Sequence, residues 1–254
     1  MGLGRRKIRI DDEAAWVFNR MADVYDARPP YPSALIDALS TLASDSGPRI
    51  VDIGAGTGHV ALPLAARGFQ VVAVEPSRAM LERLRATANA RDLTLRTEHA
   101  TAEALPLGDA SIDLAIIADA LHFLDRERTA LELKRVLRAG GALAVVTCEL
   151  SDTPFLRGLV QLMREAAPRR PRELTDTTAQ LSALCDTPLN HVQQFHDHTP
   201  VDPETLARIL RSISFIGPAM NAERFADFLT RVHALPGEPA WARTFTLRSG
   251  HKRS

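Results

Sequence analysis

The chain has little cysteine, no net charge and no long hydrophobic run. Its two cysteines, Cys148 and Cys185, form neither a disulfide framework nor a CxxC metal pair, which is typical of a reducing cytosol. Lysine and arginine together number 31, as do aspartate and glutamate, so no general field attracts nucleic acid or an anionic membrane. The longest apolar runs are only strand-sized, too short to cross a bilayer. These absences favour a cytoplasmic globular protein.

The length of 254 residues fits one α/β domain with insertions. Short β-branched runs alternate with helical patterns, which predicts βαβ units and a doubly wound, mostly parallel sheet covered by helices on both faces. Ligands of such sheets bind at the carboxyl ends of the strands. The predicted strands are 49–53, 70–74, 93–97, 113–118 and 142–147, and the helices between them include 77–90, with Ser77 as N-cap, and 125–138, ended by Gly140 and Gly141.

Less regular segments flank this alternating region. A helix is predicted at 12–26, followed by the turn-rich segment 28–32 and a second helix through Leu42. Helices are also predicted at 203–211 and 222–235, and further strands at 192–197 and 243–247. Residues 151–190 read as a helical insertion over the strand ends. We therefore expect a single domain, divided into an N-terminal lid (1–47), a cofactor-binding core (48–150), the insertion (151–190) and the C-terminal part of the sheet (191–254).

The strongest local signal is the segment VDIGAGTGH at 51–59, a glycine-rich turn between a strand and a helical pattern. Glycine permits positive φ and close approach of a ligand, and the helix N-terminus offers unpaired N–H groups. In a dinucleotide fold such a turn holds a pyrophosphate. Here the spacing is G-x-G-x-G, with His59 where G-x-G-x-x-G has its third glycine. Asp52 adds a negative charge that suits a ligand with a positive amino group.

Glu75 ends the second predicted strand, about 20 residues after the glycines. A carboxylate at that place can accept both hydroxyls of an adenosine ribose. NAD enzymes place an acid similarly, so Glu75 indicates an adenosine ligand without identifying it. The alternative is a solvated loop carboxylate.

Two further motifs follow in order: AEALPL and DASIDL between 102 and 114, and LKRVLRAGG at 133–141. With the glycine turn and the Glu75 loop, they make the stretch 51–147 resemble the class I S-adenosylmethionine (SAM)-dependent methyltransferases, specifically the small-molecule group called methyltransferase type 11. The resemblance implies a Rossmann-like seven-stranded sheet with an N-terminal helical lid and a helical insertion after strand 5. It also implies SAM as cofactor and S-adenosylhomocysteine as product.

The resemblance assigns roles to individual residues. The three glycines of the turn would line the methionine moiety, Asp52 would lie near its amino group, Glu75 would hold the ribose, and the Thr101-Ala102 segment would border the adenine. In the lid, Tyr25 and Arg28 belong to a pattern similar to that of trans-aconitate methyltransferases and would close over the cofactor carboxylate; alternatively, Tyr25 packs in the lid and Arg28 is solvated. The predicted cofactor contacts are Tyr25, Arg28, Asp52, Gly54, Gly56, Gly58, Glu75, Pro76, Thr101, Ala102 and Ala118.

A methyl group on a sulfonium is already activated, so the enzyme mainly aligns the nucleophile and excludes water. A hydroxyl or carbon acid also needs a base, whereas a carboxylate does not. His122, in the LHF segment after the fourth strand, is the candidate that orients or deprotonates the acceptor, the alternative being a structural loop histidine. We expect an oxygen acceptor, a carboxylate or a hydroxyl, with carbon or nitrogen methylation in natural-product tailoring as the alternative.

The insertion is expected to set substrate choice. Its arginines fit an acidic substrate or a solvated helix face: Arg157, Arg164, Arg169, Arg170 and Arg172. His191, His196 and His198 alternate as on one strand face, but no carboxylate or cysteine constellation completes a metal site, so we expect a sheet edge and no metal.

Three rival functions remain open. An NAD-linked oxidoreductase is disfavoured by the glycine spacing. A nucleic-acid methyltransferase is disfavoured because residues 118–121 read ADAL, where amino-methylating DNA enzymes carry Asn/Asp-Pro-Pro-Tyr, and no basic extension is present. A non-catalytic SAM-binding module is the third. We expect a small-molecule substrate, no nucleic-acid or membrane partner, and a monomer or homodimer.

Overall fold

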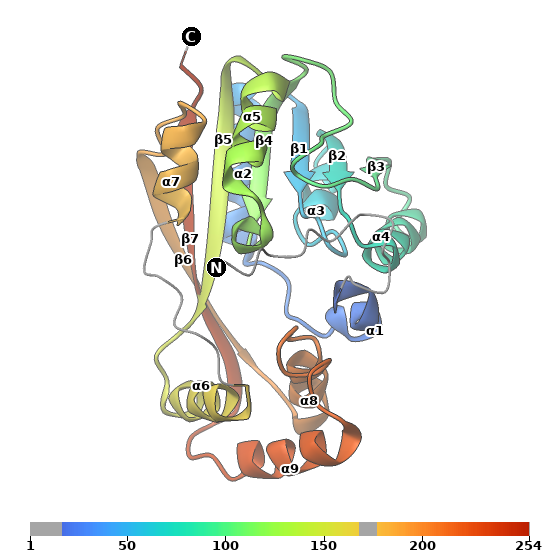
Figure 1. Ribbon diagram of the computed structural model, residues 1–254, viewed down its shortest axis with the longest axis vertical. Coiled ribbons are helices and arrows are strands. Elements are labelled where there is room, and N and C mark those ends of the chain that lie inside the picture. Colours follow the sequence, from blue (N-terminus) through green and yellow to red (C-terminus); the bar gives the residue numbers. More distant parts are fainter. Residues whose placement is uncertain (1–16, 168–176, 254) are drawn as a thin grey trace, which may run out of the picture.

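The computed structural model describes residues 17–167 and 177–253, whose strands form one seven-stranded sheet in the order β3-β2-β1-β4-β5-β7-β6 (Figure 1). Strands β1 to β5 are parallel, β7 is antiparallel to β5, and β6 is antiparallel to β7. The predicted doubly wound, mostly parallel, seven-stranded sheet is thereby confirmed. The strands are β1 (Arg49–Ile53), β2 (Gln70–Val74), β3 (Arg96–Glu98), β4 (Ile112–Ala118), β5 (Leu137–Leu150), β6 (His191–Pro200) and β7 (Ala240–His251).

Helices cover both faces of the sheet. Side chains alternate along a strand, so neighbouring residues of β4 face opposite sides of the sheet. Leu114 and Ile116 pack in the cluster that includes α2, α3 and α4. Ala115 and Ile117 pack in the cluster that includes α5 and α7. All four side chains are completely buried. The helices on the two faces are α2 (Ser33–Ser46), α3 (Ala61–Ala66) and α4 (Arg78–Ala90), and α5 (Arg126–Val136) and α7 (Thr177–Leu184).

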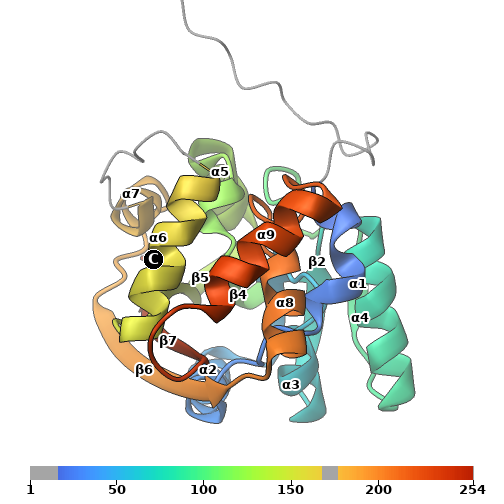
Figure 2. The ribbon, with the colours of Figure 1, turned by 90° about the horizontal axis from the view of Figure 1, so that it is seen from below.

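A second group of helices lies beyond the carboxyl ends of the parallel strands. We call α6 (Pro154–Ala166), α8 (Pro203–Arg211) and α9 (Ala222–His233) the cap; Figure 2 shows them, with α1 (Ala22–Tyr25), across that end of the molecule. Their apolar side chains recur at helical spacing and pack on Trp241 and Ala242 of β7, because an amphipathic helix must bury its apolar stripe. The cap therefore closes the end of the sheet where ligands of this architecture bind.

The insertion predicted to lie over the strand ends divides in two. Helix α6 belongs to the cap, whereas α7 packs against α5 on a face of the sheet. Residues 168–176, with Arg169, Arg170 and Arg172, lie outside the described residues. Within the described part of the insertion, α6 is therefore the helix that lies at the strand ends.

Several predicted boundaries differ from those observed. Helix α5 ends at Val136 rather than at the glycine pair, because β5 begins at Leu137 and its pairing with β4 shifts register there. Gly140 has φ of +69°, and a Cβ at Gly141 would lie 3.2 Å from the carbonyl oxygen of Asp113, so the glycines permit an irregular strand in close contact with β4.

The ends of the lid and of several helices also follow from local chemistry. Residues 12–26 do not form one helix where they are described: the 3₁₀ helix η2 (Val17–Arg20) precedes the short α1, and 12–16 lie outside the described residues. Ser77 caps α4 as predicted, its hydroxyl accepting the N–H of Met80. Helices α5, α6, α8 and α9 begin in the same way, at Asp125, Thr153, Asp202 and Asn221.

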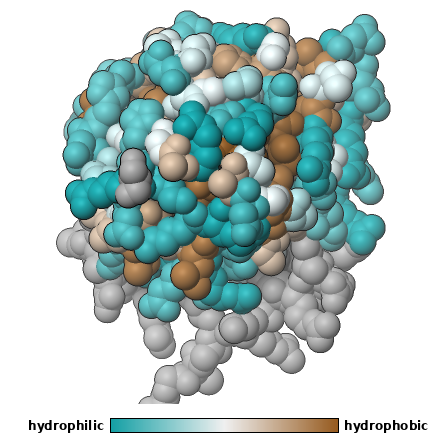
Figure 3. Space-filling view, turned by 90° about the horizontal axis from the view of Figure 1, so that it is seen from above, coloured by the Kyte–Doolittle hydropathy of each residue, from teal (hydrophilic) through white to brown (hydrophobic). Residues whose placement is uncertain are grey.

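The end of the molecule opposite the cap presents mainly hydrophilic residues with smaller hydrophobic areas between them (Figure 3). Among the described helices, none combines the length and hydrophobicity that crossing a membrane requires.

Candidate cofactor and acceptor site

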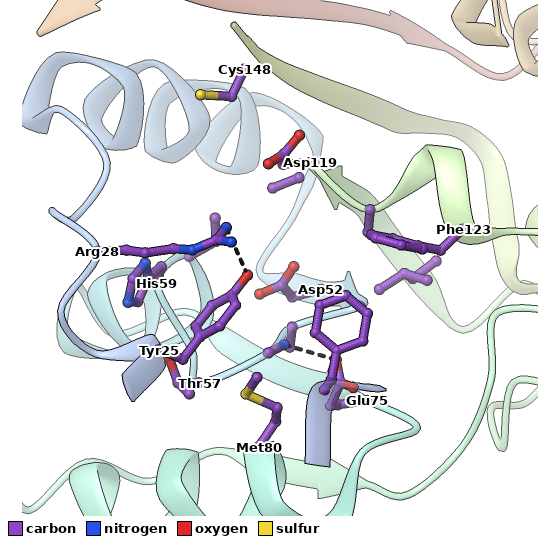
Figure 4. Close-up of a pocket in the computed structure, with 18 of the residues that line it drawn as sticks. Tyr25, Arg28, Asp52, Thr57, His59, Glu75, Met80, Asp119, Phe123 and Cys148 are labelled. Atoms are coloured by element: carbon purple, nitrogen blue, oxygen red, sulfur yellow. Dashed lines mark hydrogen bonds between the residues drawn. The ribbon is translucent and has the colours of Figure 1, made fainter. Parts of the chain in front are cut away.

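A cavity of about 410 Å³ lies between the carboxyl ends of the parallel strands, the lid and the cap (Figure 4). Its volume is within the range of small-molecule sites. The position agrees with the rule that open α/β sheets bind ligands outside the carboxyl ends of their strands. Ten of the eleven predicted cofactor contacts line it: Tyr25, Arg28, Asp52, Gly54, Gly56, Glu75, Pro76, Thr101, Ala102 and Ala118.

The glycine turn is held by its own hydrogen bonds. Gly54 and Gly56 have φ of +74° and +56°, and a Cβ at Gly54 would lie 2.7 Å from the Cβ of Ala120. The N–H groups of Gly54 and Ala55 donate to the Val74 carbonyl, and the N–H of Gly56 donates to the Glu75 carboxylate. These three N–H groups are therefore engaged within the protein and do not form an open cradle for a pyrophosphate.

Glu75 is a buried carboxylate at the end of β2. Its Oε2 accepts the N–H of Gly56 at 2.9 Å and its Oε1 accepts the N–H of Ser77 at 2.8 Å. Burial raises the pKa of Glu75 to about 7, against the lowering effect of these two bonds. The carboxylate is thus held in one orientation at the cavity wall, as a group that accepts hydrogen bonds from ligand hydroxyls must be.

Asp52, a residue of the same cavity wall, has one side-chain oxygen without a hydrogen-bond partner. Among the described residues its Oδ2 is buried with no hydrogen-bond partner, and so is the Oγ1 of Thr57, which also lines the cavity. Burial raises the pKa of Asp52 to about 7, opposed by a hydrogen bond from the N–H of Ala61. Buried polar atoms normally have partners, so these two atoms fit a ligand that brings a donor such as an ammonium group.

The lid contributes Tyr25 and Arg28. The Arg28 guanidinium lies 4.4 Å from the centre of the Tyr25 ring, donates to the Tyr25 hydroxyl at 3.4 Å, and donates to the hydroxyl and carbonyl of Ser212 at 2.8 Å each. Ser212 follows α8, so Arg28 links lid and cap. Arg28 is part-buried and bonded, which contradicts the alternative that it is solvated.

Two predicted residues lie outside the cavity wall. Gly58 has φ of +93°, and a Cβ there would lie 2.8 Å from Cγ of Leu62, so its role is in packing the turn against α3. His122 lies in the 3₁₀ helix η3 (Leu121–Phe123) with its ring centre 3.9 Å from that of Phe123. Phe123 lines the cavity and His122 does not, so the catalytic role of His122 stays a prediction that the wall does not support.

Further wall residues were not predicted from the sequence. Asp119 directly follows β4 in the sparsely populated left-handed region, with φ of +50°, and such strain in a non-glycine residue recurs at functional sites. His59 is held neutral, because burial lowers its pKa to about 4. Burial also raises the pKa of Cys148 to about 12. The unpredicted polar wall residues are Tyr31, Thr57, His59, Asp119, Cys148 and Arg243.

Arg243 of β7 fixes the lid to the sheet. Its guanidinium donates to the carbonyls of Pro29 at 3.0 Å and Pro30 at 2.7 Å and forms a buried ion pair with Asp197 of β6. These bonds position the segment that carries Arg28 and Tyr31 at the cavity.

Replacing Arg243 with alanine is expected to lower the melting temperature by about 10 °C, because it removes the cationic partner of Asp197, a part-buried carboxylate, at a cost of about 3 kcal/mol. The matched control is Arg157→Ala, which removes an exposed pair with Asp152 and is expected to cost about 1 kcal/mol or less. Thermal unfolding followed by circular dichroism measures both. Equal melting temperatures for the two variants would contradict the anchoring role of Arg243.

The other candidate sites gain no support. His191, His196 and His198 lie on the edge strand β6, and no group of three His, Cys, Asp or Glu side chains that could hold a metal ion occurs in 17–167 and 177–253. Arg157 and Arg164 are exposed on α6.

Comparison with known proteins agrees with the fold and with the glycine turn. Residues 51–145 match the family model of a methyltransferase domain. The chain is 43% identical over 119 residues to an uncharacterized methyltransferase of Mycobacterium tuberculosis, a match that covers 47% of this chain and 46% of that protein. The chain therefore matches only about half the length of this curated relative.

Solved structures of similar fold extend over most of the chain. The YcgJ protein of Bacillus subtilis has a TM-score of 0.61 at 21% identity, covering 88% of this chain and all of that one. Geranyl diphosphate C-methyltransferase from Streptomyces coelicolor, solved with S-adenosyl-L-homocysteine, has a TM-score of 0.54 at 13% identity, covering 87% and 76%. The resemblance to class I methyltransferases is confirmed in sequence for 51–145 and in fold for most of the chain; the finer likeness to trans-aconitate methyltransferases stays a prediction.

Proposed function

We propose that this protein is a SAM-dependent methyltransferase that methylates a small molecule, most readily at an oxygen atom. The observation that carries the proposal is the cavity in which an unpartnered, buried Asp52 oxygen lies beside the oriented Glu75 carboxylate. An amino acid joined to an adenosine offers both the ammonium group and the ribose hydroxyls that these two acids accept. The methyltransferase relatives support the same cofactor.

The residues present fit SAM. Asp52 and Thr57 would hold the amino group, Arg28 the carboxylate, Glu75 the ribose, and the Thr101-Ala102 segment the adenine. When bound, SAM supplies a methyl group activated by its sulfonium. The chain would then orient the acceptor and exclude water. Residues of the lid and of the segments that pack in the cap line the cavity and are placed to do this.

An acceptor hydroxyl also needs a proton acceptor. Asp119 is placed for this role, because it follows β4 at the cavity wall, and Figure 4 shows it between Cys148 and Asp52. His59 is held neutral at the wall and is the second candidate. Asp119→Asn and His59→Gln variants, assayed for turnover and SAM affinity separately, distinguish a base from a binding residue.

The NAD-linked alternative finds less support. The dinucleotide fold has the strand order 3-2-1-4-5-6, whereas here the antiparallel β7 lies between β5 and β6. The engaged N–H groups of the glycine turn and the two buried acids next to it are also a poor environment for a pyrophosphate. Methyl transfer is therefore the better account of the site.

The test is turnover. The purified protein is incubated with SAM and a panel of small alcohols, phenols, carboxylic acids, amines and carbon acids, and the products are read by mass spectrometry. Methylation of a hydroxyl or carboxylate that a Glu75→Ala variant does not perform supports the proposal. Methylation only at carbon or nitrogen would contradict the oxygen acceptor. SAM binding without turnover on any member would favour a non-catalytic module.

A further inference from the structure

The part of the cavity wall that packs against the cap is lined by apolar side chains. We call its five side chains the acceptor chamber: Leu150 at the end of β5, Met163 of α6, Ile213 and Phe215 after α8, and Trp241 of β7. Met163 and Trp241 are 6% and 7% exposed, so they are held in place by the packing of the cap. A ligand placed here meets hydrocarbon, an indole and a phenyl ring.

None of the charged wall residues named here is placed to pair with an anionic ligand in the chamber. Arg243 is neutralised by Asp197 and donates to two lid carbonyls. Arg28 is bonded to Ser212 and Tyr25 and, in the proposed function, faces the carboxylate of the cofactor. Asp119, the wall acid that directly follows β4, repels an anion.

Cys148 and His59, two further polar residues of the cavity wall, add no charge. Burial keeps the Cys148 thiol protonated, with its pKa near 12, and keeps His59 neutral, with its pKa near 4. An ionised carboxylate in this chamber would lose its hydration without gaining a cationic partner from the described wall, which is a large cost. A neutral apolar molecule gains from burying its surface there.

We propose that the acceptor chamber binds a neutral, largely apolar molecule, so that the methyl acceptor is uncharged when it binds rather than a carboxylate. This inference rests on the proposed function and narrows it. Two oxygen acceptors were expected, a carboxylate and a hydroxyl, and the inference retains the hydroxyl alone. The arginines of α6, which from the sequence fit either an acidic substrate or a solvated helix face, are exposed and are not among the residues that line the cavity.

The experiment uses Trp241 as its reporter. The chain has two tryptophans, so in a Trp16→Phe background Trp241 is the only indole. This protein is saturated with S-adenosylhomocysteine at pH 8 and titrated with tert-butylcyclohexanol or with tert-butylcyclohexanecarboxylate, which match in size and do not fluoresce. We expect the alcohol to bind at least about tenfold more tightly than the carboxylate.

Two variants of α6 localise the effect. Met163→Gln keeps the length of the side chain but makes the chamber polar, and is expected to weaken alcohol binding about fivefold while leaving the affinity for S-adenosylhomocysteine unchanged. Arg164→Gln changes the adjacent exposed residue and is expected to alter neither ligand.

Equal or tighter binding of the carboxylate would overturn the inference, and so would an unchanged alcohol affinity in Met163→Gln. A loss of carboxylate binding in Arg164→Gln would instead assign substrate choice to the exposed arginines. Failure of S-adenosylhomocysteine itself to bind would contradict the proposed function, and the calorimetric titration of that ligand alone separates this outcome from the others.

Discussion

Replacing Glu75 with alanine is expected to weaken the binding of S-adenosylhomocysteine by at least about 100-fold. Two hydrogen bonds from ribose hydroxyls to the carboxylate would be lost, each contributing about 1.5–3 kcal/mol. The two N–H groups that now orient Glu75, those of Gly56 and Ser77, would also lose their partner, so the glycine turn would be less well fixed. Isothermal titration calorimetry measures the affinity directly.

The control for this variant is Glu82→Ala. Glu82 is exposed on α4, so its replacement makes the same change of charge nearby without touching the cavity. We expect it to bind S-adenosylhomocysteine as the unchanged protein does. A Glu75→Ala variant that melts at the same temperature as Glu82→Ala and still binds the ligand with unchanged affinity would remove Glu75 from the cofactor site.

The affinity for S-adenosylhomocysteine is expected to rise with pH between 6 and 8, approaching about tenfold per unit below pH 7. The pKa of Asp52 is raised by burial to about 7, so at pH 6 most of the ligand-free protein carries this group protonated. The ligand's ammonium group binds the ionised form, so binding below pH 7 releases a proton. Calorimetry in buffers of different ionisation enthalpy counts that proton.

The raised pKa of Asp52 also predicts that the stability of the ligand-free protein falls as the pH rises, whereas the affinity for the ligand rises. Since the pKa of Asp52 is higher in the folded than in the unfolded state, the folded protein binds more protons between about pH 4 and 7, and stability falls as pH rises through that window. Asp52→Asn is expected to remove much of this loss and to stabilise the free protein at pH 8, while weakening the ligand about 10- to 100-fold. Glu75 titrates in the same range and contributes the remainder.

The matched control is Asp45→Asn, at an exposed position of α2. It should change neither the pH dependence nor the melting temperature at pH 8. An Asp52→Asn variant with the original affinity and the original proton release would show that the ammonium group of the ligand lies elsewhere.

The sequence predicted the parallel part of the fold well because its signals are local. Strands β1 and β2 and helix α8 have the predicted ends, since a buried parallel strand is a continuous apolar run and a capped helix begins at a recognisable residue. The Gly140-Gly141 pair misled the prediction of α5, because glycines that allow an irregular strand pairing resemble a helix stop.

Most of the predicted cofactor contacts line the cavity for the same reason, since Asp52, Gly54 and Glu75 each stand at or directly after the end of a parallel strand. The acceptor side was not predicted from the sequence. Its apolar side chains come from four separate segments of the chain: Leu150, Met163, Ile213 and Trp241. In its local sequence each of them resembles an ordinary apolar core residue. Only the packing of the cap brings them to one wall. His122 illustrates the converse, because it is not among the cavity-lining residues although its neighbour Phe123 is, and its catalytic role stays a prediction.

The most direct test of the central claim is to titrate the unmodified protein with S-adenosylhomocysteine and, separately, with NAD by calorimetry. The account predicts one site that binds S-adenosylhomocysteine, with binding that strengthens from pH 6 to 8, and no measurable heat with NAD. Binding of NAD in its place, or of neither ligand, would contradict the assignment of Asp52 and Glu75 to a methyl donor.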